Sequence, residues 1–162
     1  MIEIIKMTES ELSDCTEIWN SVVEEANSFP QIDTLSLSDA REFFGSQSYT
    51  GAAVIAEENE VAGVYILHPN NIGRCGHICN ASFADMKNKR GMHIGEAMVR
   101  DCIKKGGELG FKILQFNAVV KSNTAALALY KKLGFKQLGI IPNGFKLKNG
   151  SYEDIIPHYI EL

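Results

Sequence analysis

The chain has 162 residues, of which 45% are hydrophobic and 22% are charged, and these proportions predict a soluble globular protein. No apolar run approaches the roughly 18 residues that a membrane span needs, and the net charge of −4 argues against a general nucleic-acid binder. The N-terminus lacks the basic start and apolar stretch of a signal peptide, so we expect a cytoplasmic protein. The length, with no repeat or long linker, predicts a single domain over residues 1–162.

The first third of the chain alternates between strand and helix patterns. Residues 2–7 are typical of a strand, and Thr8 with Glu11 forms the pattern of a helix-starting capping box. A helix should then run to about Ala26. Its apolar stripe follows the helical period and consists of Leu12, Cys15, Ile18, Trp19 and Val22. A second, short helix is expected over residues 38–44.

The remaining two thirds continue with a predicted hairpin of strands at 52–57 and 61–67. A strand is expected at 77–85, a helix from Ile94 to Glu108, a strand at 112–120 and a helix from Asn123 to Leu133, where Gly134 suits the end of the helix. Closing strands are expected at 135–141 and 152–161. This order predicts an α/β (α+β) fold with a mixed sheet and helices on its faces.

Four scattered cysteines, Cys15, Cys75, Cys79 and Cys102, do not form the paired spacing of a zinc site. We therefore expect no metal, and we interpret the four thiols as buried and reduced.

The connection between the strand at 77–85 and the helix from Ile94 is basic and contains glycine. It carries Lys87, Lys89 and Arg90, followed by Gly91 and Gly95. A helix N-terminus offers unpaired N–H groups and a partial positive charge, and glycines allow a phosphate to approach the backbone. The loop lacks the Gly-Lys-Ser/Thr ending of a nucleotide triphosphatase and the dinucleotide fingerprint. It predicts phosphate binding, although a plain solvated turn remains an alternative.

Two segments together resemble a known superfamily. Arg90-Gly-Met-His-Ile-Gly95 is similar to the Gln/Arg-x-x-Gly-x-Gly/Ala signature of the GCN5-related N-acetyltransferase (GNAT) superfamily. About 30 residues later, the run from Asn123 to Phe135 resembles the second signature of that superfamily. The order of elements also matches, which implies a mostly antiparallel sheet of about seven strands that splays between strands 4 and 5. His93 departs from the pattern, since the superfamily usually has glycine there.

The resemblance implies direct acetyl transfer from acetyl-CoA to an amine. Tyr130 matches the general acid that would protonate the departing thiolate, although its helical spacing also fits simple core packing. The other matching positions would contact acetyl-CoA: backbone groups of Phe83, Ala84 and Asp85 for the thioester and arm, amides of Arg90, Gly91, Met92, His93, Ile94 and Gly95 for the pyrophosphate, and Asn123, Ala126 and Tyr130 along the arm.

The acceptor amine must lose a proton, because an amine with a pKa near 10.4 is only about one part in a few thousand neutral at pH 7. Glu24, Glu25 and Asp85 are candidate proton acceptors. Each is also readily interpreted as a solvated surface acid.

Asn80 and Asn117 lie inside predicted strands, where asparagine is disfavoured and a buried amide needs partners. If their strands are the two that splay, both amides face one notch; structural hydrogen bonding is the alternative. The segments around them resemble fungal N-acetyltransferases that act on proline analogues such as azetidine-2-carboxylate. That resemblance implies that Asn80 and Asn117 bind the acceptor and that Asn80 acts in catalysis beside Tyr130.

The sequence thus predicts an acetyl-CoA-dependent N-acetyltransferase for a small-molecule amine, such as an amino or imino acid. A protein or peptide N-acetyltransferase is an alternative on the same fold. A non-catalytic acyl-CoA-binding regulatory module is the alternative that His93 supports. Homodimers are common in the superfamily, so the resemblance allows one here.

Overall fold

The computed structural model describes all 162 residues. Its regular elements are β1 (Ile2–Lys6), α1 (Leu12–Glu25), α2 (Leu37–Gly45), β2 (Tyr49–Ile55), β3 (Glu60–Pro69), β4 (Ile78–Asp85), α3 (Ile94–Glu108), β5 (Ile113–Val120), α4 (Thr124–Lys132), β6 (Lys136–Gln137), β7 (Ile141–Lys146) and β8 (Tyr152–Glu161). Short 3₁₀ turns precede β4 (Gly73–Cys75) and α3 (Lys87–Lys89). None of the helices combines the length and the apolar character needed to cross a membrane.

The strands form one open mixed sheet in the order β1-β2-β3-β4-β5-β8-β6, with β7 also paired to β8. Every pairing is antiparallel except that of β4 with β5. This confirms the predicted fold class, with eight strands in place of about seven. The additional strand arises because the run expected at 135–141 is interrupted by Gly139, whose φ of 118° breaks an extended strand and leaves β6 and β7 on either side.

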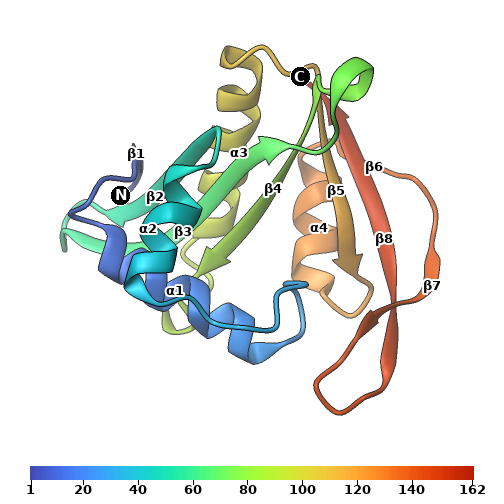
Figure 1. Cartoon of the computed structure of the whole chain (residues 1–162), viewed down its shortest axis with the longest axis horizontal. Coiled ribbons are helices and arrows are strands. Elements are labelled where there is room, and N and C mark those ends of the chain that lie inside the picture. The colour runs from blue at the N-terminus through green and yellow to red at the C-terminus, as the bar shows by residue number, and fades with distance from the viewer.

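The sheet splays between β4 and β5. Their parallel pairing is limited to Ile78 with Ile113 and Cys79 with Leu114. Beyond these pairs the two strands diverge, as Figure 1 shows. From Asn80 onward, the edge of β4 that faces β5 has no neighbouring strand to satisfy its backbone groups. Such an edge can therefore hydrogen-bond to a ligand.

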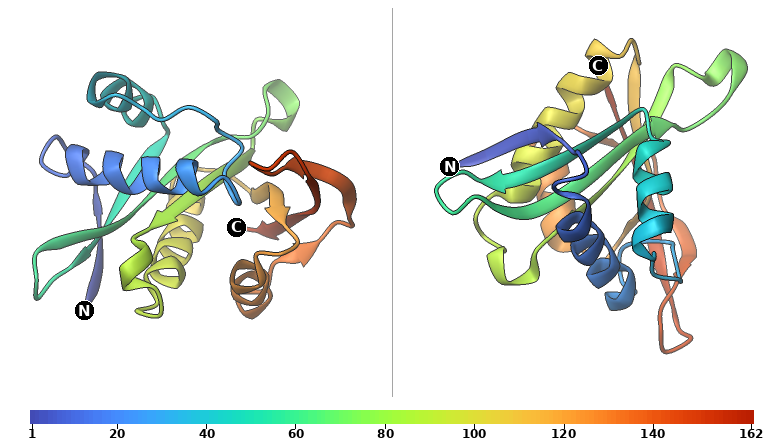
Figure 2. Two further views of the ribbon diagram at one scale, coloured as in Figure 1. Left: turned by 90° about the horizontal axis from the view of Figure 1, so that it is seen from below. Right: turned by 60° about the vertical axis from the view of Figure 1, so that its left-hand side comes forward.

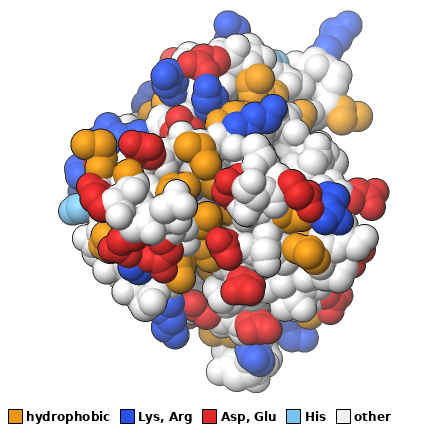
Figure 3. All heavy atoms as spheres, turned by 90° about the vertical axis from the view of Figure 1, so that its left-hand side faces the viewer, with side chains coloured by type: hydrophobic (Ala, Val, Ile, Leu, Met, Phe, Trp, Pro, Cys, Tyr) orange, Lys and Arg blue, Asp and Glu red, His pale blue; other side chains and the backbone are white.

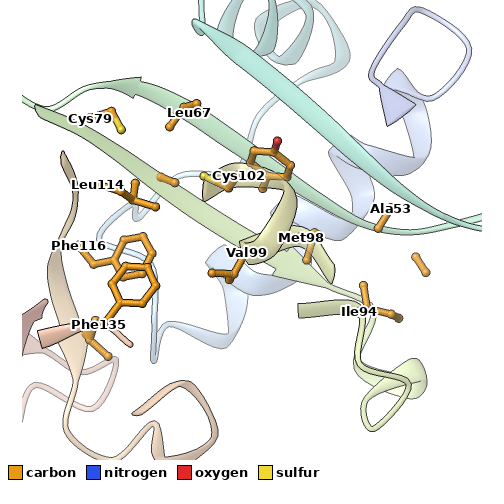
Figure 4. Close-up of a cluster of buried hydrophobic side chains, with 14 of the residues drawn as sticks. Ala53, Leu67, Cys79, Ile94, Met98, Val99, Cys102, Leu114, Phe116 and Phe135 are labelled. Atoms are coloured by element: carbon orange, nitrogen blue, oxygen red, sulfur yellow. The ribbon is translucent and has the colours of Figure 1, made fainter. Parts of the chain in front are cut away.

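The helices cover both faces of the sheet, with α1 and α2 on one side and α3 and α4 on the other (Figure 2). The apolar stripe predicted for α1 is buried, which confirms the helical interpretation: Leu12, Cys15, Ile18, Trp19 and Val22 are all 6% exposed or less. On the opposite face, Ile94, Met98 and Val99 of α3 pack over the central strands, and Phe116 stacks on Phe135 at the far end of the same core (Figure 4).

The start of α3 approaches β3 closely because Gly63 lacks a side chain. A Cβ atom at Gly63 would lie 3.0 Å from side-chain atoms of both Ile94 and Met98, and 3.1 Å from the Ala84 carbonyl oxygen. These distances are shorter than normal van der Waals contact. Gly63 therefore allows the first turn of α3 to sit directly beside the end of β4.

Two local predictions differ from the structure. The Thr8 N–H donates to the Glu11 carboxylate at 2.8 Å, as in a capping box, but residues 8–11 form a separate turn and the regular helix begins at Leu12. Cys15, Cys79 and Cys102 are buried, whereas Cys75 is exposed. The prediction of burial was wrong for Cys75, because it lies in the β3–β4 connection, which projects away from the sheet (Figure 1).

Candidate active site

Two cavities occupy the region where β4 and β5 diverge. The larger has a volume of about 580 Å³ and the smaller about 190 Å³. Five residues line both: Ser28, Phe83, Asn123, Ala126 and Tyr130. These residues come from the α1–α2 connection, from β4 and from the start and inner face of α4. The two cavities therefore meet across the gap in the sheet.

The larger cavity lies against the N-terminus of α3. The backbone N–H groups of His93, Ile94, Gly95 and Glu96 donate to no acceptor within the protein, and all four residues line this cavity. An α-helix of 15 residues adds the positive end of its dipole to these donors. Unpaired amides of this kind form a ready site for a phosphate or other anion, and they lie where the sequence predicted phosphate binding.

His93 occupies the N-cap position of α3 with φ of 59° and ψ of 23°, in the left-handed region. Glycine adopts this conformation without steric cost, which explains why the signature that this segment resembles usually has glycine at this position. The His93 side chain remains 81% exposed, with Nδ1 3.7 Å from Glu96 Oε2. It therefore lies at the rim of the cavity and leaves the backbone amides accessible.

Arg90 forms ion pairs with two carboxylates at the mouth of the larger cavity. Its guanidinium lies 3.3 Å from Glu25 on α1, and its Nε is 4.0 Å from Asp85 at the end of β4. Burial raises the pKa of Asp85, while Arg90 partly opposes that rise. Glu25 and Asp85 both line this cavity. Glu24, the third candidate proton acceptor, is exposed and lines neither cavity.

The other residues expected to contact acetyl-CoA are not all placed in the cavities. Asn123 caps α4, where its side chain accepts the Ala126 N–H at 3.2 Å, and both residues line the two cavities together with Phe83. Ala84 is 1% exposed, its side chain packs beneath α1, and it is paired with Val64 of β3. It lines neither cavity, so its expected contact with the acyl-donor arm has no support in this geometry. Met92 is 42% exposed and lines neither cavity.

Tyr130 lies at the junction of the cavities. Its ring packs against Phe116, Phe135 and His158, with centroids 4.6, 5.3 and 5.6 Å away. Burial raises the pKa of Tyr130 above its ordinary value, so the hydroxyl stays protonated at neutral pH. Burial lowers the pKa of His158. The contact of this histidine with Tyr130 was not predicted from the sequence, because His158 lies inside an otherwise ordinary strand.

The smaller cavity brings Asn80 and Asn117 together, as the predicted splay required. Asn80 Oδ1 accepts the Ala81 N–H at 2.7 Å, which leaves its two amide N–H donors directed elsewhere. No acidic or basic side chain lines this cavity. Phe29 and Pro30 of the α1–α2 connection also line it, and no feature of the sequence had indicated a site role for them.

Comparison with known proteins agrees with this geometry. A sequence model of the acetyltransferase (GNAT) family matches residues 9–135. The chain belongs to this family. N-acetyltransferase aca1 of Schizosaccharomyces pombe is 29% identical over 161 residues, which cover 96% of this chain and 68% of that protein. The predicted family, and its likeness to a fungal N-acetyltransferase, are thereby confirmed.

Solved structures show the same fold. A GCN5-related N-acetyltransferase from Kribbella flavida is 27% identical, with a TM-score of 0.90 over 99% of this chain and 98% of that one. A GNAT phosphinothricin acetyltransferase from Sinorhizobium meliloti, in complex with acetyl-CoA, is 18% identical, with a TM-score of 0.90 over 99% and 88%. The family uses acetyl-CoA as its acyl donor, and this GNAT chain is accordingly an N-acetyltransferase.

Proposed function

We propose that the enzyme transfers an acetyl group directly from acetyl-CoA to the amine of a small amino or imino acid. One observation carries this proposal: a small cavity that is uncharged and rich in amide donors opens, past Tyr130, into a larger cavity that ends on free helix amides.

The larger cavity fits the acyl donor. Its volume of about 580 Å³ lies within the usual range for ligand sites. The free N–H groups of His93 to Glu96 would take the pyrophosphate, while Phe83, Asn123 and Ala126 would line the path of the arm into the gap. The thioester at the end of that arm supplies the acetyl group.

The smaller cavity suits an acceptor that carries its own carboxylate. Asn80 presents two N–H donors and Asn117 one, because its second N–H is bonded within the protein. Charge-assisted hydrogen bonds to neutral donors stabilise a carboxylate without a basic side chain. A volume of about 190 Å³ is roughly that of six water molecules, which suits a small acceptor.

The reaction then needs three proton movements. The acceptor ammonium first releases a proton to water, because only the neutral amine can attack the thioester carbonyl. After this attack a C–N bond forms and the C–S bond breaks. Tyr130, held protonated by burial, donates its proton to the departing sulfur. The amine proton leaves through water toward Glu25 or Asp85, which line the adjoining cavity.

The test is an acceptor panel with acetyl-CoA, in which free CoA thiol is measured. The panel pairs each amino or imino acid with the amine that lacks its carboxylate, and it adds short peptides. We expect turnover with small amino or imino acids and at least about tenfold lower kcat/KM for the matched amines, the loss of one charge-assisted hydrogen bond. Equal rates for both members of each pair would contradict the proposal.

A second candidate, a peptide acceptor, is favoured by the charge of the α1–α2 segment. Residues 8–45 carry nine acidic residues and one basic residue, and Figure 3 shows groups of acidic side chains on the side of the molecule that includes β1 and β2. The α1–α2 connection also lines the smaller cavity. Higher kcat/KM for basic peptides than for any free amino acid would select this candidate.

A further inference from the structure

Asn117 occupies an unusual place in β5. The pairing of β5 with β8 is regular from Ile113 to Phe116 and resumes only at Val119, so Asn117 falls in a β-bulge. A bulge re-aims a side chain but removes its residue from the ladder. Asn117 is also exposed. The backbone alone therefore does not hold the Asn117 carboxamide in place at the smaller cavity.

Two side chains outside that cavity hold this carboxamide. Gln115 Nε2 donates to Asn117 Oδ1 at 3.0 Å, and Asn117 Nδ2 donates to Asn70 Oδ1 at 2.7 Å. Neither Gln115 nor Asn70 lines the smaller cavity. The three amides form a chain of hydrogen bonds that fixes the side-chain torsions of Asn117.

Both ends of this chain are anchored in regular structure. Gln115 is paired with Tyr159 in the β5–β8 ladder. The Asn70 N–H donates to the Ile78 carbonyl oxygen at 2.8 Å, which ties it to the first residue of β4. The chain thus connects the ends of β3 and β4 to the bulge in β5, across the splay of the sheet.

We propose that Asn70, through Asn117, is a positioning residue that sets acceptor affinity in this enzyme. With both partners bound, Asn117 retains one N–H and one oxygen lone pair for the acceptor. Without Asn70 the carboxamide keeps only the hydrogen bond from Gln115, so its orientation is less fixed and the acceptor must order it on binding. Ordering a free side chain weakens binding by about 2- to 10-fold. The inference rests on the proposed role of Asn117 in acceptor binding.

The variants that test this are Asn70→Ala, Asn70→Asp and the control Asn71→Ala. Asn71 is the exposed neighbouring residue in the same connection. We expect Asn70→Ala to raise the acceptor KM about fivefold, within the range above, with unchanged KM for acetyl-CoA and unchanged Tm. Asn70→Asp retains an acceptor for the Asn117 N–H, so it should stay within about twofold of wild type. Asn71→Ala should match wild type.

A double-mutant cycle separates this role from general damage. In an Asn117→Ala background, Asn70→Ala should change the acceptor KM no further. A further increase there, or no effect of Asn70→Ala in the wild-type background, would overturn the inference. The measurements use whichever amine the wild-type enzyme acetylates. Failure of amino acids as acceptors would therefore reject the proposed function while the cycle still decides the role of Asn70.

Discussion

The two cavities offer different groups for ligand recognition. The larger one presents backbone N–H groups at a helix end, rimmed by the charged side chains of Arg90, Glu25 and Asp85. The smaller one presents side-chain amides and no charge. Backbone N–H groups remain after almost any substitution, whereas side-chain N–H groups do not. Binding of acetyl-CoA should therefore tolerate mutation, and binding of the acceptor amine should be sensitive to it.

Tyr130 belongs to both cavities, and its loss should have the largest effect. Tyr130→Phe removes the proton donor but keeps the packing against Phe116, so we expect kcat to fall by at least about 10²-fold, the usual scale of general acid catalysis. Both KM values should change little. Steady-state kinetics with saturating acceptor measure this.

The matched control for Tyr130 is Tyr152→Phe, since Tyr152 is 56% exposed on β8 and lies in neither cavity. It should retain wild-type turnover. If Tyr130→Phe also retained wild-type turnover with a good acceptor, Tyr130 would be a packing residue and the proton would come from elsewhere.

Asn80 tests the smaller cavity alone. Asn80→Asp keeps an oxygen for the Ala81 N–H but replaces two donors by a negative charge. For an acceptor with a carboxylate, we expect kcat/KM to fall about 50-fold, the loss of charge-assisted hydrogen bonds. Asn80→Ala should lose about tenfold, since it removes the donors without adding charge. Acetyl-CoA affinity should persist in both, and a better rate for Asn80→Asp would identify a cationic acceptor without a carboxylate.

Arg90 tests the charged rim of the larger cavity. Arg90→Gln leaves the carboxylates of Glu25 and Asp85 without their partner beside an anionic ligand. We expect the acetyl-CoA KM to rise about fivefold at low salt and less at high salt, because exposed charges are screened. The acceptor KM should not change. The control is Arg41→Gln, because Arg41 pairs with Glu9 and neither residue lines a cavity. An equal effect there would mean a general response to net charge.

A substitution of His93 tests whether its imidazole contributes to acetyl-CoA binding at the rim of the larger cavity. His93→Gly relieves the left-handed strain while adding backbone freedom, so the free energy of unfolding should rise by at most about 1 kcal/mol. The acetyl-CoA KM should stay within about threefold, because the amide donors remain. A loss of more than tenfold would show that the imidazole itself contacts the phosphate.

The sequence indicated the proposed acyl-donor side more completely than the proposed acceptor side, and the groups that each cavity offers explain why. A helix N-terminus and its loop are local in sequence, so the segment from Arg90 to Gly95 could be found by pattern alone. Asn80 and Asn117 could be paired only through the expected splay. The contacts of Asn70 with Asn117, and of Arg90 with Glu25, join residues 47 and 65 positions apart. No local pattern encodes such contacts. The interruption at Gly139 that separates β6 from β7 could be recognised only from the backbone conformation in the structure.

Glu96 should give the smallest effect, and one that depends on pH. It joins the two helices that flank the larger cavity, since it pairs with Lys132 of α4 and with Arg100 of α3. Lys132 and then Arg100 lower the pKa of Glu96 to about 2. Because the folded pKa lies below the unfolded one, these ion pairs stabilise the fold above about pH 4.5. That contribution is lost as the pH falls toward 2.

Glu96→Gln removes this dependence. Denaturant unfolding should show wild type as the more stable protein at pH 7, with a difference that shrinks through pH 4 and disappears near pH 2. Acceptor KM should be unaffected, because Glu96 does not line the smaller cavity. A stability difference that is independent of pH would mean that Glu96 acts through packing. A shift in acceptor KM would mean that the two cavities are coupled through α4, and it would contradict the idea that they bind acetyl-CoA and the acceptor independently.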